Sequence, residues 1–147
     1  MSLKEVLQQD LKTAMKEKDT LRKNVIIMVK AGILQIEKDK KIELDDEGVI
    51  EVIAKGVKQR KDSIVEFEKG NREDLIENIN KEIDILMSYL PQQLSEEEVS
   101  KIVAETIIEV GASSAKDMGK VMSALMPKVK GRADGKLVNI IVKQQLQ

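Results

Sequence analysis

Apolar side chains recur at intervals of three and four residues along almost the whole chain, and this spacing is the strongest constraint on its fold. The clearest stripe consists of Ile76, Ile79, Ile83, Leu86 and Leu90. Such spacing places apolar side chains on one face of an α-helix, whereas a half-buried strand alternates apolar and polar residues. No segment shows that alternation, and no internal repeat is present. The pattern therefore predicts an all-α protein.

Capping residues and turn formers divide the pattern into seven predicted helices. Ser2 with Glu5 and Ser95 with Glu98 fit the capping box of a helix start. The other predicted helix starts are at Asp19, Asp45, Asn71, Ser114 with Asp117, and Asp134. The predicted ends are near Glu17, Ile36, Gly70 as a left-handed cap, Leu90, Gly111, and Pro127 with Gly131. Gly32 lies within an apolar face, where it costs about 1 kcal/mol of helix propensity, and this predicts a close approach of another helix.

Pro91 and the residues after it mark the expected domain boundary. Proline stops a helix because it lacks an N–H and clashes with the preceding turn. We expect residues 1–90 to form an N-terminal domain of long helices, arranged as hairpins or a bundle. Residues 95–147 are expected to form a small three-helix C-terminal domain, which would bury a limited share of its surface.

Composition excludes several classes of site. The chain contains no Cys and no His, which removes disulfides, thiolate metal sites and the usual general base. Clustered carboxylates such as Glu96–Glu98 are explained by the first turn of a helix. No serine, lysine or carboxylate is placed by the sequence as a nucleophile beside a base. We therefore expect no catalytic residue, no metal and no cofactor.

The expected location is the cytoplasm. No apolar run approaches the roughly 20 residues of a membrane span, so no membrane association is expected. The first residues, MSLKEVLQQDLK, have no apolar core of a secretory leader.

Charge is divided unevenly along the chain. The stretch 72–109 holds three basic and ten acidic residues, whereas 116–143 holds seven basic and two acidic residues. The basic side chains gather around one glycine-containing turn, which predicts a phosphate-binding patch. Its candidate RNA-binding residues are Lys120, Lys128, Lys130, Arg132, Lys136, Gly131 and Gly135. The alternative is a solvated surface whose charges pair between helices, with glycines that serve only the turn.

Two further features of this region have ordinary explanations. The turn GRADGK is not a nucleotide-binding P-loop, since three residues lie between its glycines, where a P-loop has four, and Leu137 replaces the Ser or Thr. Met118, Met122 and Met126 share one helix face, which favours core packing; an adaptable docking surface is the alternative.

Several motifs resemble the YqeY-like family, also called the GatB/YqeY family. They are residues 89–98 (YLPQQLSEEE), residues 117–122 (DMGKVM) and residues 131–135 (GRADG). The resemblance implies an all-α fold whose C-terminal part is similar to the tail domain of the B subunit of tRNA-dependent amidotransferase. That tail helps to hold tRNA. The resemblance leads us to expect a stand-alone bacterial protein of this family.

The resemblance leads to an expected function. We expect a non-catalytic helical module of tRNA metabolism that binds tRNA, or a tRNA-modifying or aminoacylating enzyme, through its basic C-terminal unit. The alternative is a protein–protein adaptor that binds no RNA. Activity as a carbon–nitrogen ligase with glutamine as amido-N-donor is implied by family association alone.

Overall fold

Seven α-helices and one short 3-10 helix make up the computed structural model, which describes residues 1–147. There is no strand, so the predicted all-α class is confirmed. The elements are α1 (Leu3–Lys16), α2 (Thr20–Lys40), α3 (Asp46–Lys69), α4 (Glu73–Met87), α5 (Glu96–Val110), η1 (Ala115–Asp117), α6 (Met118–Val129) and α7 (Gly135–Leu146). The chain divides into two compact units, Met1–Leu90 and Pro91–Gln147.

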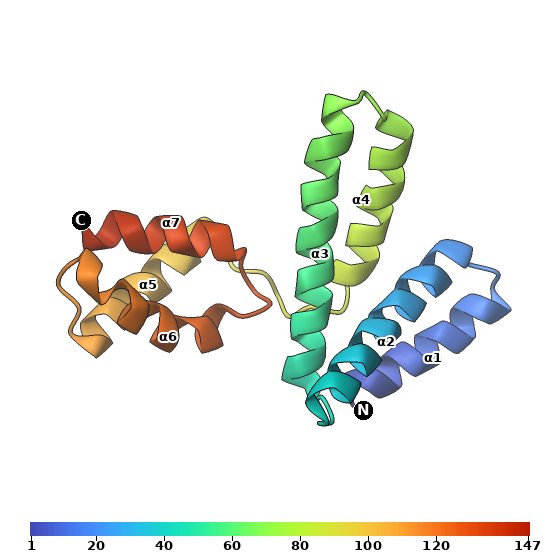
Figure 1. Ribbon diagram of the computed structural model, residues 1–147, viewed down its shortest axis with the longest axis horizontal. Coiled ribbons are helices and arrows are strands. Elements are labelled where there is room, and N and C mark those ends of the chain that lie inside the picture. The colour runs from blue at the N-terminus through green and yellow to red at the C-terminus, as the bar shows by residue number, and fades with distance from the viewer. The chain divides into compact units, whose positions relative to one another are not determined.

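The first unit consists of two helical hairpins, α1 with α2 and α3 with α4 (Figure 1). Helix α2 also contacts α3 and α4, so it joins the two hairpins. The predicted apolar stripes meet in one core, which includes Leu7, Val25, Ile26, Val49, Ile53 and Leu86. Each of these side chains is at most 1% exposed, and their burial contributes to the hydrophobic stabilisation of the unit.

Polar contacts attach α1 to segments that are distant in sequence. The Leu3 N–H donates to Asp46 Oδ1 at 2.9 Å, which ties the start of α1 to the start of α3. The Tyr89 hydroxyl donates to Asp10 Oδ2 at 2.5 Å. Burial, together with the Asp10 carboxylate, raises the pKa of Tyr89 to about 12.

In the second unit, α5 contacts both α6 and α7, and α6 also contacts α7. The core of this unit includes Val99, Val103, Val121, Leu125, Val138 and Val142. The capping boxes predicted at Ser2 and at Ser95 are both present. The Ser95 N–H donates to the Glu98 carboxylate and holds the pKa of Glu98 below its usual value.

Helix α3 ends at Lys69 with Gly70 as its C-cap, as predicted, but the conformation predicted for Gly70 and the helix start predicted at Asn71 are wrong. Gly70 has a φ of −96°, so it is not left-handed, and the left-handed residue is Asn71 with a φ of 55°. Asparagine tolerates this region because its short amide can bond locally. Asn71 therefore ends the turn rather than starting α4, whose N-cap is Arg72 without a side-chain capping bond.

Two other helix limits differ from the expectation. Helix α2 continues beyond its predicted end near Ile36 to Lys40, and α4 ends at Met87 rather than near Leu90. Helix α6 is preceded by η1, and it ends at the buried Val129, between the predicted markers Pro127 and Gly131.

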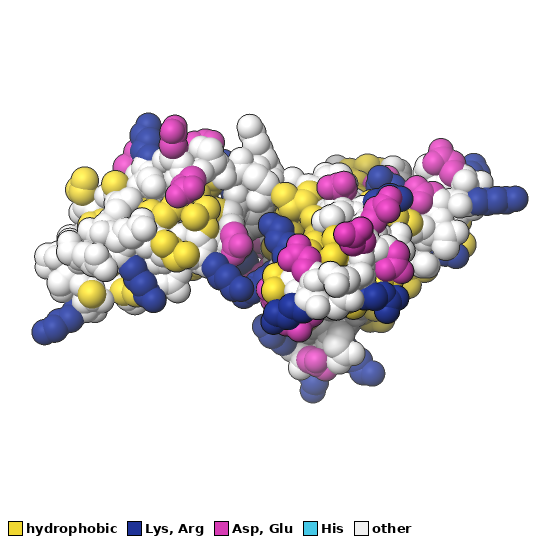
Figure 2. Space-filling view, turned by 90° about the horizontal axis from the view of Figure 1, so that it is seen from above, with side chains coloured by type: hydrophobic (Ala, Val, Ile, Leu, Met, Phe, Trp, Pro, Cys, Tyr) yellow, Lys and Arg dark blue, Asp and Glu magenta, His cyan; other side chains and the backbone are white.

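The surface of both units is mixed in character. Figure 2 shows basic and acidic side chains interspersed over the visible face, with hydrophobic side chains exposed among them. None of the helices combines the length and the hydrophobicity that a membrane crossing requires.

Candidate functional site

The turn predicted to bind phosphate is occupied by contacts within the second unit. The Leu94 N–H donates to the Arg132 carbonyl at 2.8 Å, and Gln93 Nε2 donates to the Gly131 carbonyl at 2.7 Å. Arg132 Nε donates to the Gln92 carbonyl at 3.4 Å. Gly131 has a φ of 73°, so the turn itself requires a glycine there. These hydrogen bonds attach the turn to residues 92–94, which precede α5.

Lys128 is engaged by α5. Its ammonium donates to Thr106 Oγ1 at 3.0 Å and forms an ion pair with Glu109 at 2.6 Å. Thr106 is fully buried, and its hydroxyl donates to the Ile102 carbonyl at 2.8 Å. Lys128 therefore joins α6 to α5, as the paired-charge alternative anticipates.

The remaining candidates around this turn differ in their surroundings. Lys120 lies near Asp117, whose pKa is held below its usual value, chiefly by the Ser113 N–H. Lys130 and Lys136 also take part in polar interactions. Gly135 begins α7 with open space where a side chain would lie. The assignment of the seven residues to RNA contact stays a prediction.

The methionine face of α6 serves mainly the core. Met118 and Met122 are half-buried against the second core, and Met126 alone is exposed, at 40%. This favours core packing over the docking surface that the adaptor alternative required. No group of three or more carboxylates converges where a metal ion could be held.

A different surface, which sequence reasoning missed, lies on α2. Ile27, Met28 and Leu34 are 47%, 59% and 65% exposed, and Ala31 between them is exposed as well. Ile27, Ala31 and Leu34 follow one another at the i, i+4, i+7 spacing of a single helix face. We call these four residues the α2 stripe. Buried side chains such as Val25 and Val29 lie on the opposite side of α2, so this helix is apolar on two faces.

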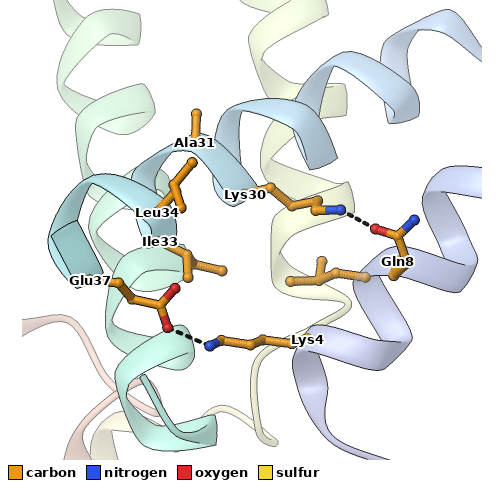
Figure 3. A pocket seen from close by; sticks show the side chains of 8 residues that line it. Lys4, Gln8, Lys30, Ala31, Ile33, Leu34 and Glu37 are labelled. Carbon is orange, nitrogen blue, oxygen red and sulfur yellow. Dashed lines mark hydrogen bonds and ion pairs between the residues drawn. The ribbon is translucent and has the colours of Figure 1, made fainter. Parts of the chain in front are cut away.

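One hollow of about 400 Å³ borders the α2 stripe on the side of α1. Two polar bridges between α1 and α2 cross it, Lys4 with Glu37 and Lys30 with Gln8 (Figure 3). The lining between these bridges is apolar and includes Leu7, Ile33 and Leu34.

Glu37 accepts two hydrogen bonds at one end of that hollow. The Lys4 ammonium bonds to its carboxylate, and the Leu44 N–H donates to Glu37 Oε2 at 2.7 Å. These contacts, that of Lys4 foremost, hold the pKa of Glu37 below its usual value. One carboxylate thus links α1, α2 and the loop before α3.

A second hollow, of about 270 Å³, borders the α2 stripe on the side of α3. Met28 belongs both to the stripe and to this hollow, so the two surfaces are continuous. The side chains of Lys55 and Arg60, from α3, line it, and no carboxylate does. The α2 stripe therefore lies between two hollows with cationic groups in their linings.

Two features of the sequence are related to the α2 stripe. The segment 20–36 contains Arg22, Lys23 and Lys30 but no acidic residue, in a chain of 26 acidic residues. Its apolar residues are too many for one buried face. Neither feature says which face is left uncovered.

Comparison with known proteins gives a family and a set of fungal relatives. A family model described as Yqey-like protein matches residues 4–146. The relatives are each named "Altered inheritance of mitochondria protein 41, mitochondrial". That of Pyrenophora tritici-repentis is 34% identical over 131 residues, which is 86% of this chain and 71% of the relative. That of Kluyveromyces lactis is 45% identical over 105 residues (66% and 55%), and that of Lachancea thermotolerans is 40% identical over 111 residues (74% and 59%).

These findings correct the expected function. The relatives' names concern the inheritance of mitochondria, and none mentions tRNA, an amidotransferase or a ligase. The prediction of a tRNA-binding module or amidotransferase partner is therefore wrong. The basic turn on which that prediction was based has a structural role, since its backbone carbonyls accept hydrogen bonds from the residues that precede α5.

The expected location is corrected by the same names. The relatives are called mitochondrial, which contradicts the predicted cytoplasmic location, and they are fungal, so the expected bacterial origin finds no support. The expectation that the chain takes no cofactor stays a prediction. This chain spans between 55% and 71% of the length of these three relatives.

The family model covers nearly every residue of both units and includes all the motifs from which the resemblance was inferred. The chain belongs to the YqeY-like protein family.

Proposed function

We propose that this protein takes part in the inheritance of mitochondria by binding an amphipathic helix of a partner protein on the α2 stripe. The proposal rests on one observation: four apolar residues are exposed on one face of α2, and a hollow borders that face on either side. Contiguous apolar surface of this kind marks interaction sites, and helical partners present their anchors at the same spacing.

Charge indicates what kind of helix would bind. The α2 segment 20–36 is free of acidic residues and carries three cations, and Lys55 and Arg60 border the stripe from α3. Glu37, the carboxylate of the first hollow, is already paired with Lys4. Acidic residues beside the apolar face of the partner would therefore be complementary to this surface.

In this proposal the two units are separate domains with different tasks. The first, a bundle of two hairpins, carries the binding surface. The second is a three-helix domain stabilised by its own core and by the hydrogen bonds between the basic turn and the segment that precedes α5. The mitochondrial part of the proposal is supported by the names of the relatives.

The test is rescue in Kluyveromyces lactis cells that lack their own relative and are scored for mitochondrial inheritance. The chain is delivered to mitochondria with a leader peptide. We expect the wild-type chain to restore inheritance and the double variant Ile27→Ser, Leu34→Ser to fail.

The matched control is Ile108→Ser with Ile140→Ser, which removes two exposed apolar side chains from the second unit. This control should rescue as well as the wild type. Equal rescue by the α2 variant, with equal amounts of folded protein, would refute the proposed surface. Failure of the wild-type chain would refute the shared mitochondrial role.

A further inference from the structure

The hollow between α2 and α3 is open because two glycines face it. A side-chain carbon at Gly32 would lie 3.2 Å from Val52 Cγ1, and one at Gly56 would lie 3.6 Å from Leu86 Cδ1. With no side chain at either position, apolar groups such as Val29, Val52 and Leu86 line a recess. Gln35, Lys55 and Gln59 add polar groups to the lining.

Arg60 lines this recess with incomplete hydrogen bonding. Its side chain is only 14% exposed, and its Nε–H is buried without an acceptor. Arg60 Nη1 donates to the Gly56 carbonyl at 3.2 Å, and Nη2 donates to Met28 Sδ at 3.7 Å and forms an ion pair with Glu82 Oε1 at 3.7 Å. Buried donors are ordinarily satisfied, so this guanidinium retains capacity for a further acceptor.

The charge around Arg60 favours an anionic acceptor. Lys55 lies in the same lining, which contains no acidic residue, and Glu82 forms a long ion pair with Arg60 from outside the lining. A guanidinium forms its strongest bonds to carboxylates, which accept two of its N–H groups at once.

We infer that Arg60 binds the carboxylate of a Glu or Asp side chain that projects from the partner helix docked on the α2 stripe. Met28 connects the stripe to the recess, so a helix lying on the stripe reaches the recess with one side chain. Apolar contacts on the stripe would provide affinity, and the recess would select partners with an acid at one register position. This inference rests on the proposed function.

The test uses two synthetic helical peptides with apolar residues at i, i+4 and i+7. One carries a central Glu flanking the apolar face, and the other carries Gln there. Binding to the full chain is measured by calorimetry. We expect the Glu peptide to bind wild-type protein about tenfold or more tightly than the Gln peptide, the factor typical of a hydrogen bond to a charged group.

Variants of α3 assign that difference to Arg60. In Arg60→Gln the two peptides should bind equally, whereas in Lys61→Gln, an exposed neighbour on the same helix, the difference should persist. Arg60→Lys keeps the positive charge and should retain part of the difference in affinity between the two peptides. This variant keeps the test decisive if Arg60→Gln lowers the stability of the protein. Circular dichroism checks the fold of each variant.

The outcomes separate the two proposals. If both peptides bind wild-type protein with equal affinity, or if Arg60→Gln preserves the difference, the carboxylate inference is wrong and the helix-binding surface stands. If neither peptide binds, the proposed function fails as well. Binding to vesicles of phosphatidylcholine and phosphatidylglycerol, or self-association, in place of peptide binding would give the stripe a different occupant and overturn both.

Discussion

Replacement of Gly56 by alanine should stabilise the first unit. Alanine in the interior of α3 gains about 1 kcal/mol of helix propensity over glycine. The added methyl would lie 3.4 Å from Arg60 Nη1 and 3.6 Å from Leu86 Cδ1. The second distance is ordinary contact, and the first involves the far end of a flexible side chain. We therefore expect the free energy of unfolding to rise by about 0.5–1 kcal/mol.

The same replacement at Gly32 should behave differently. There the new methyl would lie 3.2 Å from Val52 Cγ1. Valine in a helix has one strongly preferred rotamer, so Val52 cannot turn away. Overpacking of this kind costs about 1–3 kcal/mol, which offsets or exceeds the gain in propensity. Gly32→Ala should leave stability unchanged or lower it by up to about 2 kcal/mol.

The assay is urea unfolding followed by tyrosine fluorescence. Tyr89 is the one tyrosine of a chain without tryptophan, and it packs against the first core, so its emission reports on the first unit. The transition midpoint should move to higher urea for Gly56→Ala, with an unchanged slope. A loss of stability in Gly56→Ala, or equal gains in both variants, would refute the reasoning from these contact distances.

Three further predictions concern titrating and capping groups. Because the pKa of Tyr89 is raised to about 12, stability should fall as the pH rises from 10 towards 12, where only the unfolded phenol ionises. Asp10→Asn should move the phenol titration, followed by ultraviolet absorbance, to lower pH, and an unchanged titration would exclude a role for the Asp10 charge. Ser95→Ala should lower the free energy of unfolding of the second unit by about 1 kcal/mol, measured by circular dichroism, while Ser95→Asn should be nearly neutral. The lowered pKa of Glu37 means that its contribution is present above pH 4.5 and is lost as the pH falls below that value. Glu37→Gln should therefore flatten the acid side of the stability profile, and a profile as steep as that of the wild type would show that the bond to Lys4 does not stabilise the folded state.

The helical character of the protein and most of the starts of its helices were predictable because both depend on local interactions. Apolar spacing determines which residues can share a helix face, and a capping box needs only residues within one turn. Ser2 and Ser95 accordingly cap the helices they were predicted to cap. Gly32 was likewise placed correctly at a close helix approach, since Val52 lies against it.

Helix ends were less predictable because neighbouring structure competes with local preference. Pro127 lies inside α6 and does not stop it, and the helix ends at Val129, which is buried in the core. Asn71 takes the left-handed conformation that was assigned to Gly70, because either residue suits a helix end and the packing of α3 with α4 selects one.

The sequence by itself determined that this chain is helical, that it belongs to the YqeY-like family and where its basic and acidic segments lie. Tertiary structure alone decided what those segments do. The basic turn holds the entry to α5 through backbone carbonyls, which no residue pattern reveals. Helix α2 is apolar on two faces, and only packing against α1, α3 and α4 shows which face is buried. The exposed face, and the unsatisfied Arg60 beside it, arise from contacts between residues far apart in the chain, and local sequence preferences do not encode such contacts.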